Sequence, residues 1–261
     1  MTRLSSSHYI LGSKKESLTE LCKINPSWNY EKLFFKTGIK VRHLLSESET
    51  PESLSEAAGN ECLGKVEKNK DIDGLIFVTQ SPTIPLPTRA CLLQDKLGLQ
   101  KNMLAFDINQ GCSGFVYALS LANSLIKSDQ ANRILIICAD HYSKYISLND
   151  RTSRPIFSDA AAAIIIEKSK TETIGPFIFR TDGSGGEFLT VKKENEILEF
   201  LKTSNIDTFI IALDDHEIFD KHKYIKILYD FNISIIIFDK DNNYSNLSNK
   251  IDIGSLLFRN Q

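Results

Sequence analysis

Residues 107–118 read DINQGCSGFVYA and place one cysteine, Cys112, at a sharp corner of the chain. The apolar run before it, residues 102–109, has the composition of a strand, and residues 113–128 carry apolar side chains at helical spacing. The small residues GCSG mark the turn between the two elements. Two interpretations follow: Cys112 fills a buried space as a small hydrophobe, or it is a nucleophile at a helix N-terminus.

The corner has the features that a reactive thiol needs. The thiolate is the nucleophilic form of cysteine, and the N–H groups and peptide dipole at a helix N-terminus stabilise negative charge. Gly111 and Gly114 allow a tight turn and a close approach to a bound group. Such a thiol suits acyl transfer, with the N–H of Cys112 as a donor to the thioester oxyanion. Free cysteines are often buried, so the local sequence leaves both interpretations open.

A strand–helix rhythm surrounds the corner and predicts a layered α/β fold. Continuous apolar runs are typical of strands that are buried on both faces of a sheet. The predicted strands are 73–79, 102–109, 133–140 and 160–168, and the predicted helices are 51–69, the end of 81–99, and 113–128.

The pattern weakens after a shift in composition near residue 170, which predicts two halves, 1–170 and 171–261. The segment NNYSNLSNK, residues 242–250, is polar and predicts a turn. The other elements predicted for the second half are strands at 174–182, 186–192, 207–213 and 234–240, and helices at 196–204 and 222–231.

Composition excludes several classes of function. The 31 Lys and Arg residues nearly balance the 33 Asp and Glu residues, so the charge gives no case for nucleic acid or an anionic membrane. No apolar run is long enough to span a bilayer, and the N-terminus lacks the features of a signal peptide. The 5 cysteines form no CxxC pair and no zinc-ligand cluster. We therefore expect a reduced, cytoplasmic protein without a metal site.

The segment DINQGCSGFVYALSLANSLIKS closely resembles the active-site segment of the ketoacyl-ACP synthase III family of thiolase-fold condensing enzymes. Four more segments resemble that family in the same order, and together the matches cover roughly residues 1–190. They are KTGIKVRH (36–43), SPTIPLPTRACLLQDKLGL (81–99), DRTSRPIFSDAAAAIIIEKS (150–169) and TDGSGGEFLTV (181–191).

The resemblance implies a thiolase-like fold, layered α-β-α-β-α, with a reduced second half. It implies that Cys112 accepts an acyl group from acyl-CoA or acyl-ACP, and that malonyl-ACP then condenses with it in fatty-acid-type synthesis. No permanently bound cofactor or metal is implied. The partners implied are acyl carrier protein, small thioesters and a second copy of the chain in a homodimer.

The family completes its site with a histidine and an asparagine from the second half. Registering residues 206–209 on the family pattern puts Ala212 where the histidine stands, and alanine cannot donate a hydrogen bond. His216 lies 4 residues later and replaces it only if the loop changes shape; otherwise it is a surface residue. Asn246 falls in the asparagine position of the predicted turn, where a backbone role is equally consistent.

Arg42 and Arg151 are candidates for binding the phosphates of coenzyme A or phosphopantetheine, because the guanidinium offers a planar fork to oxyanions. A solvated arginine is an equally good interpretation of Arg151. Cys62, Cys91 and Cys138 are expected in the core.

The loss of the histidine leaves two alternatives to condensation open. One is acyl transfer from Cys112 to an alcohol or amine, and the other is a non-catalytic relative that acts as a partner of an intact synthase.

Overall fold

The computed structural model describes residues 1–66, 71–186, 208–212, 234–238 and 244–247. The chain divides into two compact units, Met1–Thr181 and Asp182–Gln261. The first unit contains β1 (Thr2–Leu11), β2 (Lys14–Ser17), α1 (Leu18–Ile24), α2 (Tyr30–Thr37), β3 (Val41–Leu44), α3 (Pro51–Gly64), β4 (Gly74–Val78), α4 (Arg89–Lys96), β5 (Leu104–Ile108), α5 (Gly114–Lys127), β6 (Arg133–Asp140) and β7 (Ala160–Lys168).

A five-stranded sheet in the order β1-β7-β6-β4-β5 forms the centre of the first unit. The strands β5, β4 and β6 are parallel to one another, whereas β7 is antiparallel to β6 and to β1. Four of these strands lie where the apolar runs predict them, so the α/β interpretation is confirmed for this unit.

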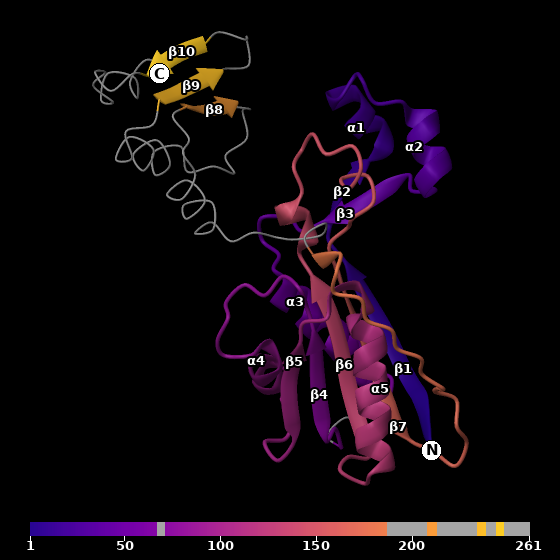
Figure 1. Ribbon diagram of the computed structural model, residues 1–261. Coiled ribbons are helices and arrows are strands. Elements are labelled where there is room, and N and C mark those ends of the chain that lie inside the picture. Colours follow the sequence, from indigo (N-terminus) through magenta and orange to yellow (C-terminus); the bar gives the residue numbers. More distant parts are fainter. Residues whose placement is uncertain (67–70, 187–207, 213–233, 239–243, 248–261) are drawn as a thin grey trace. The chain divides into compact units, whose positions relative to one another are not determined.

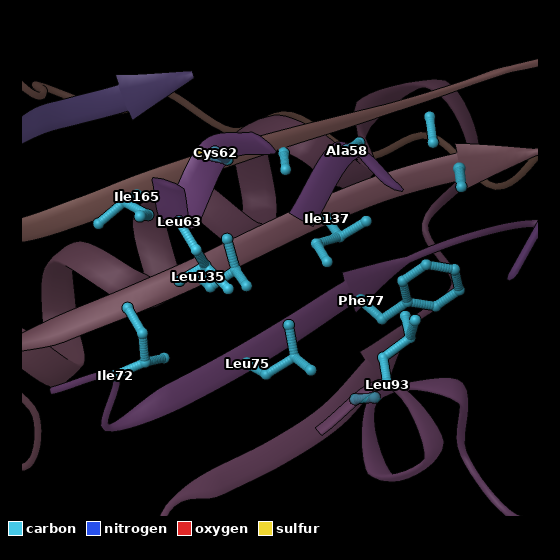
Figure 2. Packing of buried hydrophobic residues seen from close by; sticks show 14 of the residues in the cluster. Ala58, Cys62, Leu63, Ile72, Leu75, Phe77, Leu93, Leu135, Ile137 and Ile165 are labelled. Atoms are coloured by element: carbon cyan, nitrogen blue, oxygen red, sulfur yellow. The ribbon is translucent and has the colours of Figure 1, made fainter. Parts of the chain in front are cut away.

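Helices cover both faces of this sheet (Figure 1). On one face, α3 and α4 pack against inward-facing residues of β4, β6 and β7. Ala58 and Cys62 of α3 lie against this layer, with Phe77 of β4 and Ile137 of β6 in the same cluster (Figure 2). On the other face, α5 contributes Ala118, Ala122 and Ile126 to a cluster with alternate residues of the same strands. The continuous apolar runs of β4 and β6 thus supply a core on each side.

The N-terminal strand β1 is an element that apolar runs do not predict. Its sequence, TRLSSSHYIL, is largely polar, and only one face of it is turned inward. Buried polar groups on that face are hydrogen-bonded, as burial requires: Thr2 Oγ1 donates to Asn123 Oδ1 at 2.6 Å, and Ser6 Oγ donates to the Cys62 carbonyl at 2.8 Å.

Residues 12–44 form a small separate layer of the first unit. The strands β2 and β3 pair as an antiparallel hairpin, and α1 and α2 lie between them in sequence. Ser17 caps α1 in a capping box with Glu20. Leu18, Leu21 and Trp28 form the buried centre of this layer, so Trp28 is a packing residue.

Residues 171–181, expected in the second half, belong to the first unit. The strand predicted at 174–182 is wrong, because this segment has no strand pairing. Pro176 has no N–H to donate to a neighbouring strand, and the segment instead packs its aromatic side chains on α5. The Phe179 ring lies 4.7 Å from that of Tyr117, centroid to centroid, and Phe177 joins the α5 cluster.

The described part of the second unit is a three-stranded sheet, β10-β9-β8. The strands β8 (Thr208–Ala212) and β9 (Ser234–Phe238) are parallel and confirm two of the predicted strands. The third strand, β10 (Tyr244–Leu247), pairs antiparallel with β9 and replaces the turn predicted there. The predicted helices at 196–204 and 222–231 lie outside the described residues, as does all of the strand predicted at 186–192 except residue 186.

Among the described residues, no helix is both long and apolar enough to cross a membrane.

The packing of α5 on β4 gives a first testable prediction. A Cβ added at Gly114 would lie 2.5 Å from Val78 Cγ1, inside van der Waals contact. Gly114→Ala should therefore lower the free energy of unfolding by about 1–3 kcal/mol, the usual cost of overpacking. Urea denaturation followed by circular dichroism measures this.

Gly64→Ala is the matched control, because a Cβ at this last residue of α3 meets no atom within 4 Å. It should leave stability unchanged or raise it by up to about 1 kcal/mol, the helix propensity difference. Equal stability of the two variants would contradict the close packing.

Candidate active site

The carboxyl ends of three parallel strands meet at one edge of the first sheet. Val78 of β4 pairs with Ile108 of β5 on one side and with Cys138 of β6 on the other. The segments that follow these strands therefore start from the same edge. They are the loop 79–88, the corner 109–113 and the segment 141–159. Open α/β sheets bind ligands at such an edge.

The corner that holds Cys112 is a short 3-10 turn, Gly111–Ser113, between β5 and α5. Gly111 has a φ of 52°, in the left-handed region that favours glycine. The next turn of backbone enters α5 directly, and Ser113 forms no side-chain cap at the helix start. Cys112 is exposed. The predicted strand–turn–helix corner is thus present, with its thiol accessible at the helix N-terminus, where the peptide dipole favours negative charge.

Two of the three cysteines expected in the core, Cys62 and Cys138, are enclosed, whereas Cys91 is exposed. Cys138 on β6 is largely enclosed, and burial together with the neighbouring Asp140 raises the pKa of its thiol to about 12. Burial also raises the pKa of Cys62, which lies in the core as predicted. The core prediction for Cys91 is wrong: this residue is exposed on the outer face of α4, and its sulfur accepts a hydrogen bond from Thr88 Oγ1.

Asp107 lies just before the corner, and its side chain contacts the start of α4. Its two carboxylate oxygens accept hydrogen bonds from the backbone N–H groups of Arg89, at 2.7 Å, and Ala90, at 2.8 Å. These are the first N–H groups of α4, whose N-cap residue Thr88 forms no side-chain cap of its own. A carboxylate on β5 therefore caps α4 from outside the helix and ties it to the strand that carries the corner.

Asp140 at the end of β6 holds the loop after β4. Its Oδ1 atom accepts hydrogen bonds from Thr79 Oγ1 at 2.9 Å, the Gln80 N–H at 2.9 Å and Ser81 Oγ at 2.7 Å. The Thr79 N–H donates in turn to the Ile108 carbonyl of β5 at 3.1 Å. Three consecutive residues are thereby fixed beside the corner. An acidic residue that closes an apolar strand, as in RILIICAD, is the sequence signal that could have identified this role.

Asp159, fully buried before β7, is the corresponding anchor of segment 141–159. Its carboxylate accepts from the Leu45 N–H at 3.1 Å and from Ser143 Oγ at 2.6 Å. Its own N–H donates to the His43 carbonyl, and its carbonyl accepts from the Gly12 N–H. The carboxylate needs such partners, because burying it unpaired would cost free energy. The same bonds hold segment 141–159 against the N-terminal layer.

Arg42 is buried in an ion-pair network, which is not a position for binding a ligand phosphate. Its guanidinium pairs with Glu16 and also donates to the Phe157 carbonyl at 3.2 Å. Arg154 Nη2 reaches the other oxygen of Glu16 at 2.7 Å. The structure therefore corrects the phosphate-binding interpretation of Arg42: its charge joins β3, β2 and the segment before β7.

Burial of Glu16 by itself would raise the pKa of its carboxyl. The hydrogen bonds and positive charges of Arg154 and Arg42 outweigh that effect, so the pKa of Glu16 lies below its ordinary value of 4.5.

The remaining candidates are spread over both units. Arg151 is exposed in the turn of residues 151–156, within the segment that follows β6. Ala212 is the last residue of β8. Asn246 lies within β10, opposite Ile236, and not in the predicted turn. His216 lies outside the described residues.

Comparison with known proteins gives consistent results for sequence and structure. The sequence profile of the 3-oxoacyl-[acyl-carrier-protein] synthase III family matches residues 106–183. The chain is 33% identical over 219 residues to a beta-ketoacyl-[acyl-carrier-protein] synthase III of Streptococcus mutans; the match covers 84% of this chain and 66% of that relative. The chain spans about half to two thirds of the length of the curated relatives it matches.

Solved structures show the same fold. A 3-oxoacyl-(acyl-carrier protein) synthase of Burkholderia xenovorans superposes with a TM-score of 0.62 and 30% identity, over 66% of this chain and 49% of that one. A second solved 3-oxoacyl-(acyl-carrier-protein) synthase III, with 24% identity and a TM-score of 0.69, covers 94% of this chain and 98% of its own. The predicted thiolase-like α/β fold is confirmed.

The Glu16 network gives the second prediction. Glu16→Gln leaves Arg42 and Arg154 buried without their shared carboxylate, so the free energy of unfolding should fall by about 3 kcal/mol near neutral pH. Glu61→Gln is the control, because Glu61 is exposed on α3 and should change stability by less than about 0.5 kcal/mol. Urea denaturation of both variants measures the difference.

The pH dependence of the same variant gives the third prediction. A carboxyl whose pKa is lower in the folded chain than in the unfolded chain stabilises the fold fully above the unfolded value, here about 4.5. That contribution disappears as the pH falls through the folded value. The stability difference between the wild type and Glu16→Gln should therefore be constant from pH 7 to about 5.5 and shrink below about pH 4.5. A difference that grows on acidification would contradict the network.

Proposed function

Because the chain belongs to the ketoacyl-ACP synthase III family, we propose that it is an acyltransferase whose nucleophile is Cys112. The observation that carries the proposal is the position of this thiol, exposed on the turn between β5 and α5. The acyl donor is acyl-CoA or acyl-ACP, and the acceptor is malonyl-ACP, which gives a 3-oxoacyl-ACP in fatty-acid-type synthesis. No permanently bound cofactor takes part.

In the first step, the Cys112 sulfur attacks the carbonyl carbon of the donor thioester. The new S–C bond forms as the S–C bond to the donor breaks, and the donor thiol leaves with the proton that Cys112 has lost. The negative charge on the tetrahedral oxygen lies near the start of α5, where backbone N–H groups and the helix dipole stabilise it. The left-handed Gly111 sets the direction in which Cys112 meets its donor.

In the second step, malonyl-ACP loses carbon dioxide, and the resulting carbon nucleophile takes the acyl group from Cys112. This step needs hydrogen-bond donors for the enolate oxygen. Ala212 supplies none through its side chain, so we assign that role to Asn246 or His216, the candidates that the family resemblance suggests.

Arg151 is our candidate for the phosphate of the incoming carrier group. It is exposed, carries a permanent charge and belongs to the segment that follows β6, the strand paired with β4. We also place the protein in the cytoplasm, with acyl carrier protein as its macromolecular partner and a homodimer as its assembly.

The fourth prediction tests the first step. Intact-mass spectrometry after incubation with acetyl-CoA should show one acetyl group per chain, and Cys112→Ala should remove it completely. Cys91→Ala is the matched control, since it removes the other exposed thiol of the described residues without touching the corner. An adduct that persists in Cys112→Ala, or is absent with acetyl-CoA and longer acyl-CoA donors alike, would refute the proposed nucleophile.

The second step has its own assay. Acylated protein incubated with malonyl-ACP should lose the acyl group from Cys112 and produce a 3-oxoacyl-ACP of the corresponding mass. An acyl group that stays on Cys112 with malonyl-ACP, yet leaves to an added alcohol or amine, would replace condensation by simple acyl transfer. Absence of any adduct, together with tight binding to an intact synthase, would replace the enzyme by a non-catalytic partner.

A further inference from the structure

One side chain outside the corner lies directly against it. A Cβ built on Gly111 would come within 3.4 Å of Gln80 Oε1, and apart from Gly111 and its two chain neighbours no other described atom lies within 4 Å of that point. The Gln80 amide therefore borders the residue that immediately precedes Cys112. Gln80 lies 2 residues after the end of β4, and β4 pairs with β5 in the sheet. The loop that follows β4 and the corner that follows β5 are therefore neighbours by topology as well.

The position of Gln80 is fixed through its backbone. Its N–H donates to Asp140 Oδ1, and the side chains of Thr79 and Ser81 on either side donate to the same oxygen. Thr79 and Ser81 are both buried. Because the loop is held on both sides of Gln80, the amide is presented at the corner by a fixed backbone, as specific recognition requires.

The Gln80 amide has unused hydrogen-bonding capacity. The side chain is only half buried, and its carbonyl and NH₂ groups have no hydrogen-bond partner among the described residues. In the absence of substrate, water can satisfy them. An acyl group on Cys112 that extends past Gly111 meets this amide and displaces that water.

Once the water is displaced, the amide needs a new hydrogen-bond partner, and this need determines which acyl group suits the site. An aliphatic chain placed over the amide leaves its polar atoms unpaired, which costs free energy. A chain with a hydroxyl or carbonyl group near the thioester restores the bonds. Sites built around such a polar group reject analogues that lack it.

We propose that Gln80 is a specificity-determining residue that selects acyl groups carrying a hydrogen-bonding substituent close to the thioester. The inference rests on the proposed acylation of Cys112 and adds the class of donor: a 3-hydroxyacyl or similarly substituted thioester in preference to a plain aliphatic one.

The test compares two donors of nearly equal shape, 3-hydroxybutanoyl-CoA and 3-methylbutanoyl-CoA, which differ by a hydroxyl in place of a methyl group. The initial rate of Cys112 acylation is followed by mass spectrometry for the full chain. The wild type should favour the hydroxylated donor, and Gln80→Leu should reduce the ratio of the two rates about five- to tenfold, the loss of about one hydrogen bond. Gln130→Leu, an exposed glutamine in the turn after α5, should keep the wild-type ratio.

A second measurement separates failure of this inference from failure of the proposed function. Iodoacetamide, which carries a carboxamide, and 1-iodopropane, which does not, each alkylate a thiol with loss of iodide. The ratio of their rates at the Cys112 peptide should also fall several-fold in Gln80→Leu, whether or not the protein accepts acyl-CoA.

The outcomes are distinct. Acylation by neither of these donors nor by acetyl-CoA and longer acyl-CoA donors, with a shifted alkylation ratio, overturns the acyltransferase proposal and keeps the contact between Gln80 and the group on Cys112. Acylation with unchanged ratios in Gln80→Leu overturns the inference alone. Unchanged alkylation in the absence of acylation overturns both.

Discussion

The close approach of α5 to β4 is the constraint on which the corner depends. A helix can start 6 residues after β5 and still lie against the neighbouring strand only if its first residue has no side chain, because Val78 already occupies the space where a Cβ would point. Gly114 meets that condition, and Gly111 supplies the left-handed backbone that turns the chain toward it. Cys112 lies between these two glycines, so the packing of the helix determines where its thiol is presented.

Three aspartates fix loops of the first unit by accepting hydrogen bonds from them. Loops leave backbone N–H groups without the partners that strands and helices provide, and a carboxylate accepts several of them at once. Asp107 does so for the start of α4, Asp140 for residues 79–81 and Asp159 for the segment before β7. The aspartates are structural in their contacts, yet they hold segments that follow or precede the strands of the sheet that carries Cys112. Rigid support of this kind limits how far a substrate-contacting group can move.

The sequence predicts the parallel strands and the corner well, because a strand buried on both faces must be apolar throughout, whatever lies around it. It predicts β1 and β10 poorly, since both have largely polar sequences that read as loops. In β1 the polar residues are tolerated because one face of the strand is solvated. A single sequence also does not show which distant charged side chains form ion pairs. Glu16 lies 26 residues from Arg42 and 138 from Arg154. The planar fork of a guanidinium is therefore not enough to predict a phosphate ligand at Arg42, where a buried carboxylate already pairs with the charge.

The two proposed steps, acylation and condensation, place different demands on this chain. Acylation requires an accessible thiol and backbone donors at a helix start, and both belong to the unit Met1–Thr181. Condensation also requires side-chain donors that handle the enolate, and every position expected to supply them falls in Asp182–Gln261. A change at position 212 would thus alter the proposed second step and leave the first intact, because the thiol owes its position to Gly111, Gly114 and the strand beneath them. The proposed specificity for the acyl group separates in the same way, since Gln80 is held by Asp140 within the first unit.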